Sequence, residues 1–128
     1  MTAKIVTVEI FEGGKITMTI NEYQQLALRT APKISEPSQR LLNGLMGLNG
    51  EAGEAIDILK KHLFQGHWLD SEHIAKELGD VAWYLAVSAD ALGYKLEDIF
   101  ENNIRKLKDR YPEGFDPKRS INRKEGDI

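Results

Sequence analysis

Cysteine is absent from the 128-residue chain, which excludes disulfide bonds and metal sites built from thiolates. An excess of positive charge is also absent. The chain has 17 lysine and arginine residues and 20 aspartate and glutamate residues, so its formal net charge is −3. Such a chain has no general attraction for nucleic acid or for an anionic membrane surface. No apolar run approaches the roughly 20 residues that span a bilayer, and the N-terminus lacks the apolar core of a signal peptide. We therefore expect a cytoplasmic protein that binds neither nucleic-acid polymers nor membranes.

Several signatures of catalytic and cofactor sites are missing as well. The chain has no GxxxxGK[ST] phosphate-binding loop and no GxSxG nucleophile motif. A di-iron helical bundle uses Glu-x-x-His pairs, and no histidine follows a relevant glutamate at that spacing. The three histidines, His62, His67 and His73, do not form a compact set of ligands in the sequence. These absences argue against transition-metal redox chemistry and against a serine nucleophile.

The residues that are present predict one folded domain with a short β-hairpin at its start. Hydrophobic residues make up 41% of the chain and charged residues 29%, which is typical of a soluble globular protein. Residues 4–11 and 15–20 are rich in β-branched side chains, and Glu12, Gly13 and Gly14 separate them. An isolated hairpin is marginally stable in water. We therefore expect it to pack on the helices, on a partner or on its copy in another subunit.

Helical patterns follow the hairpin. A short helix is predicted from Asn21 to the residues before Pro32, followed by helices over residues 38–64, 71–92 and 96–110, with Asp70 or Ser71 as the cap of the third. The last helix ends because proline at position 112 cannot continue it. The fold class is thus mainly α, an antiparallel helical bundle with a hairpin. We divide the chain into a hairpin at 1–20, a helical domain at 21–112 and a polar tail at 113–128, which we expect to be extended or partly disordered.

Four glycines interrupt the longest predicted helix, at Gly44, Gly47, Gly50 and Gly53. Each interior glycine costs about 1 kcal/mol relative to alanine. Their presence indicates that packing or function requires small residues in this segment. Close contact with another helix and close approach of a ligand both explain them.

Two acidic pairs carry the chemistry that the sequence predicts. Glu51 and Glu54 lie three apart on one helix, and Glu77 and Asp80 lie three apart on the next, so each pair projects from one face. A turn after the first helix makes the two helices antiparallel and lets the pairs face each other. The alternative is that the carboxylates are solvated surface charges. This fits Glu77 and Asp80 less well, because apolar residues occupy both sides of their helix and a carboxylate near a core needs a partner or a metal. All-oxygen ligands favour Mg²⁺, with Mn²⁺ as a substitute.

Three segments of the chain together resemble the MazG-like family of all-α nucleotide pyrophosphohydrolases. They are GLNGEAGEAIDILKK, KELGDVAWYLAVSADALGYKLEDI and NNIRKLKDRYP, within residues 38–112. The family pattern is Glu-x-x-Glu, a spacer, and Glu-x-x-Asp, and the chain fills it with Glu51, Glu54, Glu77 and Asp80. An Asn-x-x-Lys turn and an Arg-Tyr-Pro ending are also similar, filled here by Asn103 and Lys106 and by Arg110, Tyr111 and Pro112.

The resemblance implies hydrolysis of a nucleoside triphosphate, NTP or dNTP, between the α and β phosphates to give a monophosphate and pyrophosphate. It implies a metal site at the four carboxylates, where bound Mg²⁺ activates a water molecule. Glu51 or Glu54 is the candidate general base. Asn103 and Lys106 are candidate phosphate contacts, although a lysine near a helix C-terminus also complements the helix dipole. The alternative function is a non-catalytic helical module that binds nucleotide or mediates assembly.

Two aromatic residues are further candidates for substrate binding. Trp68 lies in the loop between the acidic helices, where it either stacks on a nucleobase or closes the core. Tyr84, one turn beyond Asp80, is either a pocket wall or a core residue. Residues 81–92 are apolar almost all the way round, and the other helices of one chain cannot easily cover such a segment. We therefore expect a homodimer or a dimer of dimers.

Overall fold

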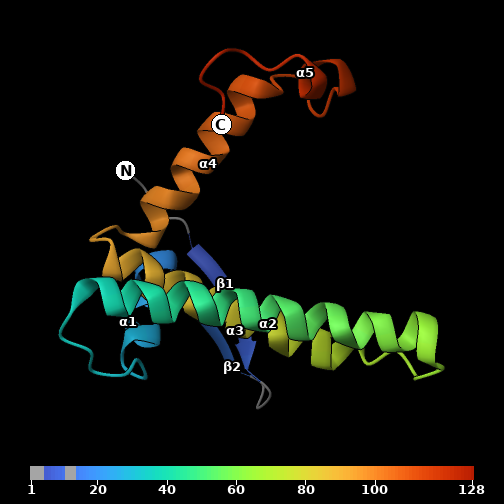
Figure 1. Cartoon of the computed structure of the whole chain (residues 1–128). Helices are drawn as coiled ribbons and strands as arrows, with labels where there is room; N and C mark the ends of the chain where they lie inside the picture. Colours follow the sequence, from blue (N-terminus) through green and yellow to red (C-terminus); the bar gives the residue numbers. More distant parts are fainter. Residues whose placement is uncertain (1–4, 11–13) are drawn as a thin grey trace. The chain divides into compact units, whose positions relative to one another are not determined.

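The computed structural model describes residues 5–10 and 14–128, with side chains described from residue 17 onward. In chain order the elements are β1 (Ile5–Ile10), β2 (Gly14–Thr19), α1 (Ile20–Leu28), α2 (Pro37–Gln65), α3 (Ser71–Ala91), α4 (Leu96–Arg110) and α5 (Pro117–Ile121) (Figure 1). The chain divides into two compact units, Met1–Leu96 and Glu97–Ile128. No helix among the described residues is both long enough and apolar enough to cross a membrane.

The N-terminal hairpin is confirmed. β1 and β2 pair antiparallel, with a register that runs from Ile5 opposite Thr19 to Ile10 opposite Gly14. Glu12 and Gly13, which were predicted to form the turn, lie outside the described residues. The hairpin leads directly into α1, because Thr19 ends the strand and also caps the helix.

The start of α1 corrects the predicted helix start at Asn21. The hydroxyl of Thr19 accepts the backbone N–H of Glu22 at 3.1 Å, and the Glu22 carboxylate accepts the backbone N–H of Thr19 at 2.6 Å. These reciprocal bonds form a capping box. Because Thr19 and Glu22 already accept backbone N–H groups at the start of the helix, α1 begins at Ile20, before Asn21.

The helices α2 and α3 form the long axis of the first unit and lie side by side (Figure 1). Glu36 caps α2, Pro37 occupies its first turn and Gly66 ends it with φ 72°. Asp70 caps α3 by accepting the backbone N–H of His73 at 2.9 Å. Since Asp70 was one of two predicted caps, the structure decides between them.

Two of the four glycines explain how closely these helices approach. A Cβ on Gly44 would lie 2.2 Å from Ser88 Oγ, and a Cβ on Gly47 would lie 2.1 Å from the Tyr84 ring. Gly44 lies against Ser88, and Gly47, further along α2, lies against the earlier residue Tyr84 of α3. The two helices are therefore antiparallel. At Gly50 and Gly53 an added Cβ meets nothing within 4 Å. Helix packing therefore accounts for the first two glycines, and the second two face open space.

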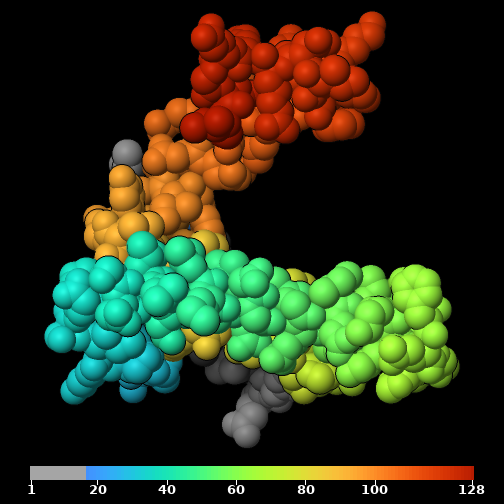
Figure 2. All heavy atoms as spheres, in the orientation of Figure 1, coloured from blue at the N-terminus to red at the C-terminus, as the bar shows by residue number. Residues whose placement is uncertain are grey.

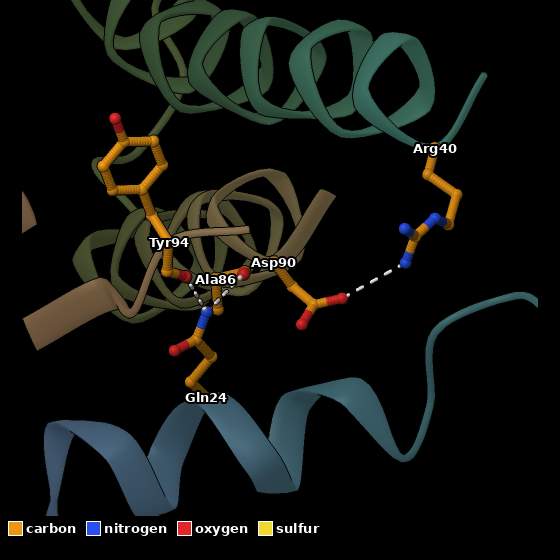
Figure 3. Close-up of polar contacts among 5 residues, drawn as sticks. All are labelled: Gln24, Arg40, Ala86, Asp90 and Tyr94. Atoms are coloured by element: carbon orange, nitrogen blue, oxygen red, sulfur yellow. Dashed lines mark hydrogen bonds and ion pairs between the residues drawn. The ribbon is translucent and has the colours of Figure 1, made fainter. Parts of the chain in front are cut away.

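Helix α1 packs on α3 through a buried amide. Gln24 is 3% exposed, and its side-chain N–H groups donate to the backbone carbonyls of Ala86 at 3.3 Å and Tyr94 at 3.1 Å. Its carbonyl oxygen accepts the backbone N–H of Leu96 at 3.0 Å. Figure 3 shows Gln24 reaching from α1 toward both carbonyls. One side chain thus joins α1 to α3 and to the loop after it.

An ion pair joins the start of α2 to the end of α3. Arg40, in the first turns of α2, pairs with Asp90 near the end of α3 at 3.2 Å (Figure 3). The indole N–H of Trp83 donates to the Ala27 carbonyl at 3.1 Å and to the Thr30 hydroxyl at 2.9 Å. Together with Gln24, these bonds fix α3 between α1 and α2.

The second unit contains most of α4, together with α5 and the residues after it. The bounds of α4 agree with the predicted 96–110. The expectation of an extended tail is wrong at residues 117–121, which form α5 with Asp116 as the cap. Arg110 then pairs with Asp127 through two hydrogen bonds. A polar segment without periodicity is therefore held by capping and ion pairing, which a hydrophobic pattern does not reveal.

Candidate metal site and family

Three carboxylates from two helices converge in the first unit. Glu51 on α2 and Glu77 and Asp80 on α3 each offer an oxygen, and these oxygens lie within 4.8 Å of one another. The antiparallel packing of α2 on α3 produces this arrangement, because it places the residues after Gly47 opposite those before Tyr84. The predicted convergence of acidic residues on the two helices is thus seen for three of the four.

The three carboxylates differ in burial. Glu77 is 7% exposed, Glu51 is half-buried and Asp80 is exposed. We predicted that both residues of the second pair lie close to the core, and this is wrong for Asp80. Residues i and i+3 are separated by about 60° around an α-helix, because the helix has 3.6 residues per turn. When Glu77 faces α2, Asp80 therefore lies at the open edge of the interface.

Burial and the neighbouring carboxylates both act on Glu51. Its pKa is raised above the usual glutamate value, first by burial and then by a hydrogen bond with Glu77 and by the charges of Glu54, Asp80 and Glu77. A carboxyl group among like charges is harder to ionise. A hard divalent cation relieves this repulsion, and carboxylate oxygens are its preferred ligands. The donor set therefore fits Mg²⁺ or Mn²⁺.

Glu54 occupies a different position from the other three. It is exposed and is not part of the group whose oxygens converge. Its charge still contributes to the raised pKa of Glu51, so it lies near the site. Its assignment as a metal ligand or as a base stays a prediction.

Sequence reasoning missed two residues beside the carboxylates. His73 Nε2 lies 2.7 Å from Glu77 Oε1. The spacing of four residues on one helix was a signal that could have indicated this contact. Tyr23, on α1, has a pKa raised by burial and by the charge of Asp80, which places α1 beside the site. No local pattern in the sequence relates Tyr23 to Asp80, because only the packing of α1 on α3 brings them together.

The aromatic candidates have distinct surroundings. Trp68 is 92% exposed, so the alternative that it closes the core is wrong. It lines an open hollow of about 680 Å³ together with Lys61, His67 and His73. Tyr84 is half-buried against Gly47 and makes an edge-to-face contact with Trp83 at 4.9 Å between ring centroids. Tyr84 is therefore a packing residue, and a role for either ring in substrate binding stays a prediction.

Asn103 and Lys106 lie on α4 in the second unit and are both exposed. Lys106 Nζ donates to the backbone oxygen of Ile128 at 3.1 Å. Their predicted contact with phosphates stays a prediction.

Comparison with known families gives the site its context. A family model described as the MazG nucleotide pyrophosphohydrolase domain matches residues 39–115. The chain belongs to the MazG family. The match spans more than half of the chain and includes all three converging carboxylates, and it agrees with the resemblance and with the mainly α fold.

One curated protein illustrates the family relationship at the level of sequence. The chain is similar to the Gene 37 protein of Mycobacterium phage L5, with 37% identity over 73 residues. The alignment covers 54% of this chain and 64% of that protein. No solved structure matches the chain. The name of the phage protein states no activity, so the indication of a nucleotide pyrophosphohydrolase comes from the family match.

Proposed function

We propose that this MazG-family protein hydrolyses nucleoside triphosphates, NTP or dNTP, between the α and β phosphates and releases a monophosphate and pyrophosphate. The observation that supports this proposal is the convergence of Glu51, Glu77 and Asp80 within 4.8 Å inside the family match. Carboxylates held this close together repel one another, and a shared cation would offset that repulsion. The absence of cysteine is compatible with a cytoplasmic enzyme.

In this proposal Glu51, Glu77 and Asp80 hold Mg²⁺, for which Mn²⁺ can substitute, and Glu54 is a fourth candidate ligand. When bound, the ion supplies neutralisation of phosphate oxygens and a lowered pKa of water for in-line attack. Glu77 contributes a carboxylate that is buried between α2 and α3. Asp80 contributes an exposed carboxylate at the edge of that interface, where a substrate can approach.

Proton removal from the attacking water is assigned to Glu54 or Glu51. A general base has to be near the site and free to accept a proton. Glu54 meets both conditions better than Glu51, because it lies outside the converging group and is solvent-exposed. We therefore favour Glu54 as the base.

The other predicted site residues are assigned to substrate binding. An exposed indole such as that of Trp68 provides a face on which any base can stack. Lys106 supplies a positive charge and Asn103 an amide for phosphate oxygens. The ring of Tyr84 lines the α2–α3 interface between the carboxylates and Ser88 and is a candidate wall of the pocket.

We also propose that the chain forms a homodimer or a dimer of dimers. Helix α2 carries a large set of exposed apolar side chains, and its surface extends across the face shown in Figure 2. They are Leu42, Leu45, Met46, Ile56, Leu63 and Phe64. Exposed apolar surfaces of this extent are typical of protein interfaces. Light scattering at micromolar concentration should give a mass above 14.5 kDa, and a monomer at that concentration contradicts the proposal.

The activity is tested by incubating the protein with Mg²⁺ and a panel of NTPs and dNTPs and measuring pyrophosphate. Glu77→Ala should lower the rate by more than about 100-fold, a typical loss when a group that stabilises transition-state charge is removed. Glu72→Ala is the matched control, because Glu72 is an exposed glutamate of α3 that pairs with Lys76 at 3.2 Å and lies outside the group of converging carboxylates. Nucleotide binding without pyrophosphate release from any substrate would instead support the non-catalytic module. Equal rates for Glu77→Ala and the control would contradict the site.

A further inference from the structure

A histidine beside the proposed metal site covers its most buried carboxylate. His73 Nε2 lies 2.7 Å from Glu77 Oε1, one helical turn away on α3. The side chain of Glu77 is 9% exposed and that of His73 is 53% exposed. The imidazole therefore stands between Glu77 and solvent. Among the described residues no lysine or arginine side chain forms an ion pair with Glu77.

The position of His73 is fixed by the helix itself. It lies in the first turn of α3, and its backbone N–H donates to the Asp70 carboxylate at 2.9 Å. The cap holds the backbone, so the side chain starts from a defined position. The imidazole can donate from Nε2 both as the cation and as the neutral tautomer that carries its proton there. The contact therefore does not require a charged histidine.

The groups around Glu77 give this hydrogen bond a specific task. The oxygens of Glu77, Glu51 and Asp80 lie within 4.8 Å of one another. Repulsion among these carboxylates favours rotation of Glu77 away from its neighbours. A donor on Glu77 Oε1 opposes this rotation and keeps the carboxylate directed toward the other two. Carboxylates that ligate metals are generally held by such outer hydrogen bonds.

We infer that His73 is a positioning residue of the metal site, which holds Glu77 in the orientation required to bind a divalent cation. This inference rests on the metal site of the proposed function. In this inference His73 acts through Glu77 and is assigned no contact with the reacting atoms. The competing explanation is an ordinary i,i+4 pair, which stabilises a helix by about 0.2–0.5 kcal/mol and has no effect on metal binding.

The test compares three variants in the full chain without nucleotide. His73→Ala removes the donor, and His73→Gln replaces it with an uncharged side-chain amide that also donates. Lys76→Ala is the control, because it breaks the neighbouring i,i+4 pair with Glu72 and leaves Glu77 untouched. Mn²⁺ affinity is measured by calorimetry, and the stability of the metal-free protein is measured by urea unfolding.

We expect His73→Ala to weaken Mn²⁺ binding by about 10-fold or more, a typical loss for an outer-shell partner. His73→Gln should recover most of this affinity, and Lys76→Ala should bind as the wild type does. The inference is overturned if His73→Ala binds Mn²⁺ normally, if Lys76→Ala loses as much affinity, or if His73→Gln is as weak as His73→Ala.

These outcomes are separable from failure of the proposed function. Normal Mn²⁺ binding that depends on both Glu77 and His73, without pyrophosphate release, refutes the activity and supports the inference. Binding that is lost in Glu77→Ala but unchanged in His73→Ala refutes the inference alone. A wild-type protein that binds no Mn²⁺ refutes the metal site and the inference with it.

Discussion

The contact between Gly47 and Tyr84 predicts that substitution by alanine changes the free energy of unfolding differently at Gly47 and at Gly50, two nearby positions of α2. In Gly47→Ala the new Cβ would lie 2.1–2.5 Å from three atoms of the Tyr84 ring. The ring also makes an edge-to-face contact with Trp83, so moving the ring would disturb that contact. In Gly50→Ala the new Cβ meets nothing within 4 Å. Both substitutions change a glycine in the interior of the same helix.

The magnitudes follow from two terms. Replacing glycine by alanine in a helix interior stabilises the fold by about 1 kcal/mol at either position. Overpacking at Gly47 costs about 1–3 kcal/mol. Gly50→Ala should therefore raise the free energy of unfolding by about 1 kcal/mol, and Gly47→Ala should leave it unchanged or lower it by up to about 2 kcal/mol. The helix-propensity term cancels between the variants, so their difference measures the packing term.

Urea unfolding at one fixed protein concentration provides the measurement, with the free energy of unfolding extrapolated linearly to water. The fixed concentration matters because self-association shifts apparent stability. Equal stabilities of Gly47→Ala and Gly50→Ala would refute the close packing of α2 on α3 at Gly47. A Gly50→Ala variant less stable than Gly47→Ala would refute the open environment of Gly50.

Two further perturbations test the buried amide and the acidic site. Gln24→Leu should lower the free energy of unfolding by about 2–4 kcal/mol, because it leaves two backbone carbonyls and one N–H without their partner; the exposed neighbour provides a control, since Gln25→Leu should change it by less than about 0.5 kcal/mol. Glu51 has a raised pKa in the folded state, so the metal-free protein should lose stability as pH rises from the usual glutamate pKa through the raised value. Glu51→Gln should remove this loss and make the metal-free protein more stable than wild type at neutral pH in EDTA, while weakening Mn²⁺ binding. If the difference in stability between wild type and Glu51→Gln stays constant between about pH 4 and about pH 7, the raised pKa of Glu51 is contradicted.

Local sequence patterns predicted the helices well because helices are specified by local signals. Proline after Tyr111 and periodic apolar residues placed α4 at 96–110, and the structure agrees. The predicted helix at 38–64 differs from α2 by one residue at each end. The start of α1 was misplaced because both Thr19 and Asn21 are good capping residues, and only Thr19 completes a capping box with Glu22.

The candidate site was only partly predictable. The i,i+3 spacing placed each acidic pair on one helix face, and the family pattern selected the four residues. The spacing does not determine which member of a pair is buried. Glu77 is covered by α2 and His73, whereas Asp80 lies at the open edge. Trp68 was assigned equally to stacking on a nucleobase and to closing the core, because a tryptophan in a loop gives no periodic signal.

The sequence by itself determined the helical fold class, the positions of α2, α3 and α4 to within one residue at each end, and the acidic residue types that suit Mg²⁺. The tertiary structure alone decided which distant residues come together. The carboxylate of Glu51 converges with those of Glu77 and Asp80, and Gly47 packs against the ring of Tyr84. The side chain of Gln24 forms hydrogen bonds with backbone groups more than 60 residues away. Helix propensity and capping act over a few neighbouring residues, so they can be recognised in the sequence. Burial and the pKa of a carboxyl group depend on which distant side chains pack against it, and the chain fixes those neighbours only when it folds.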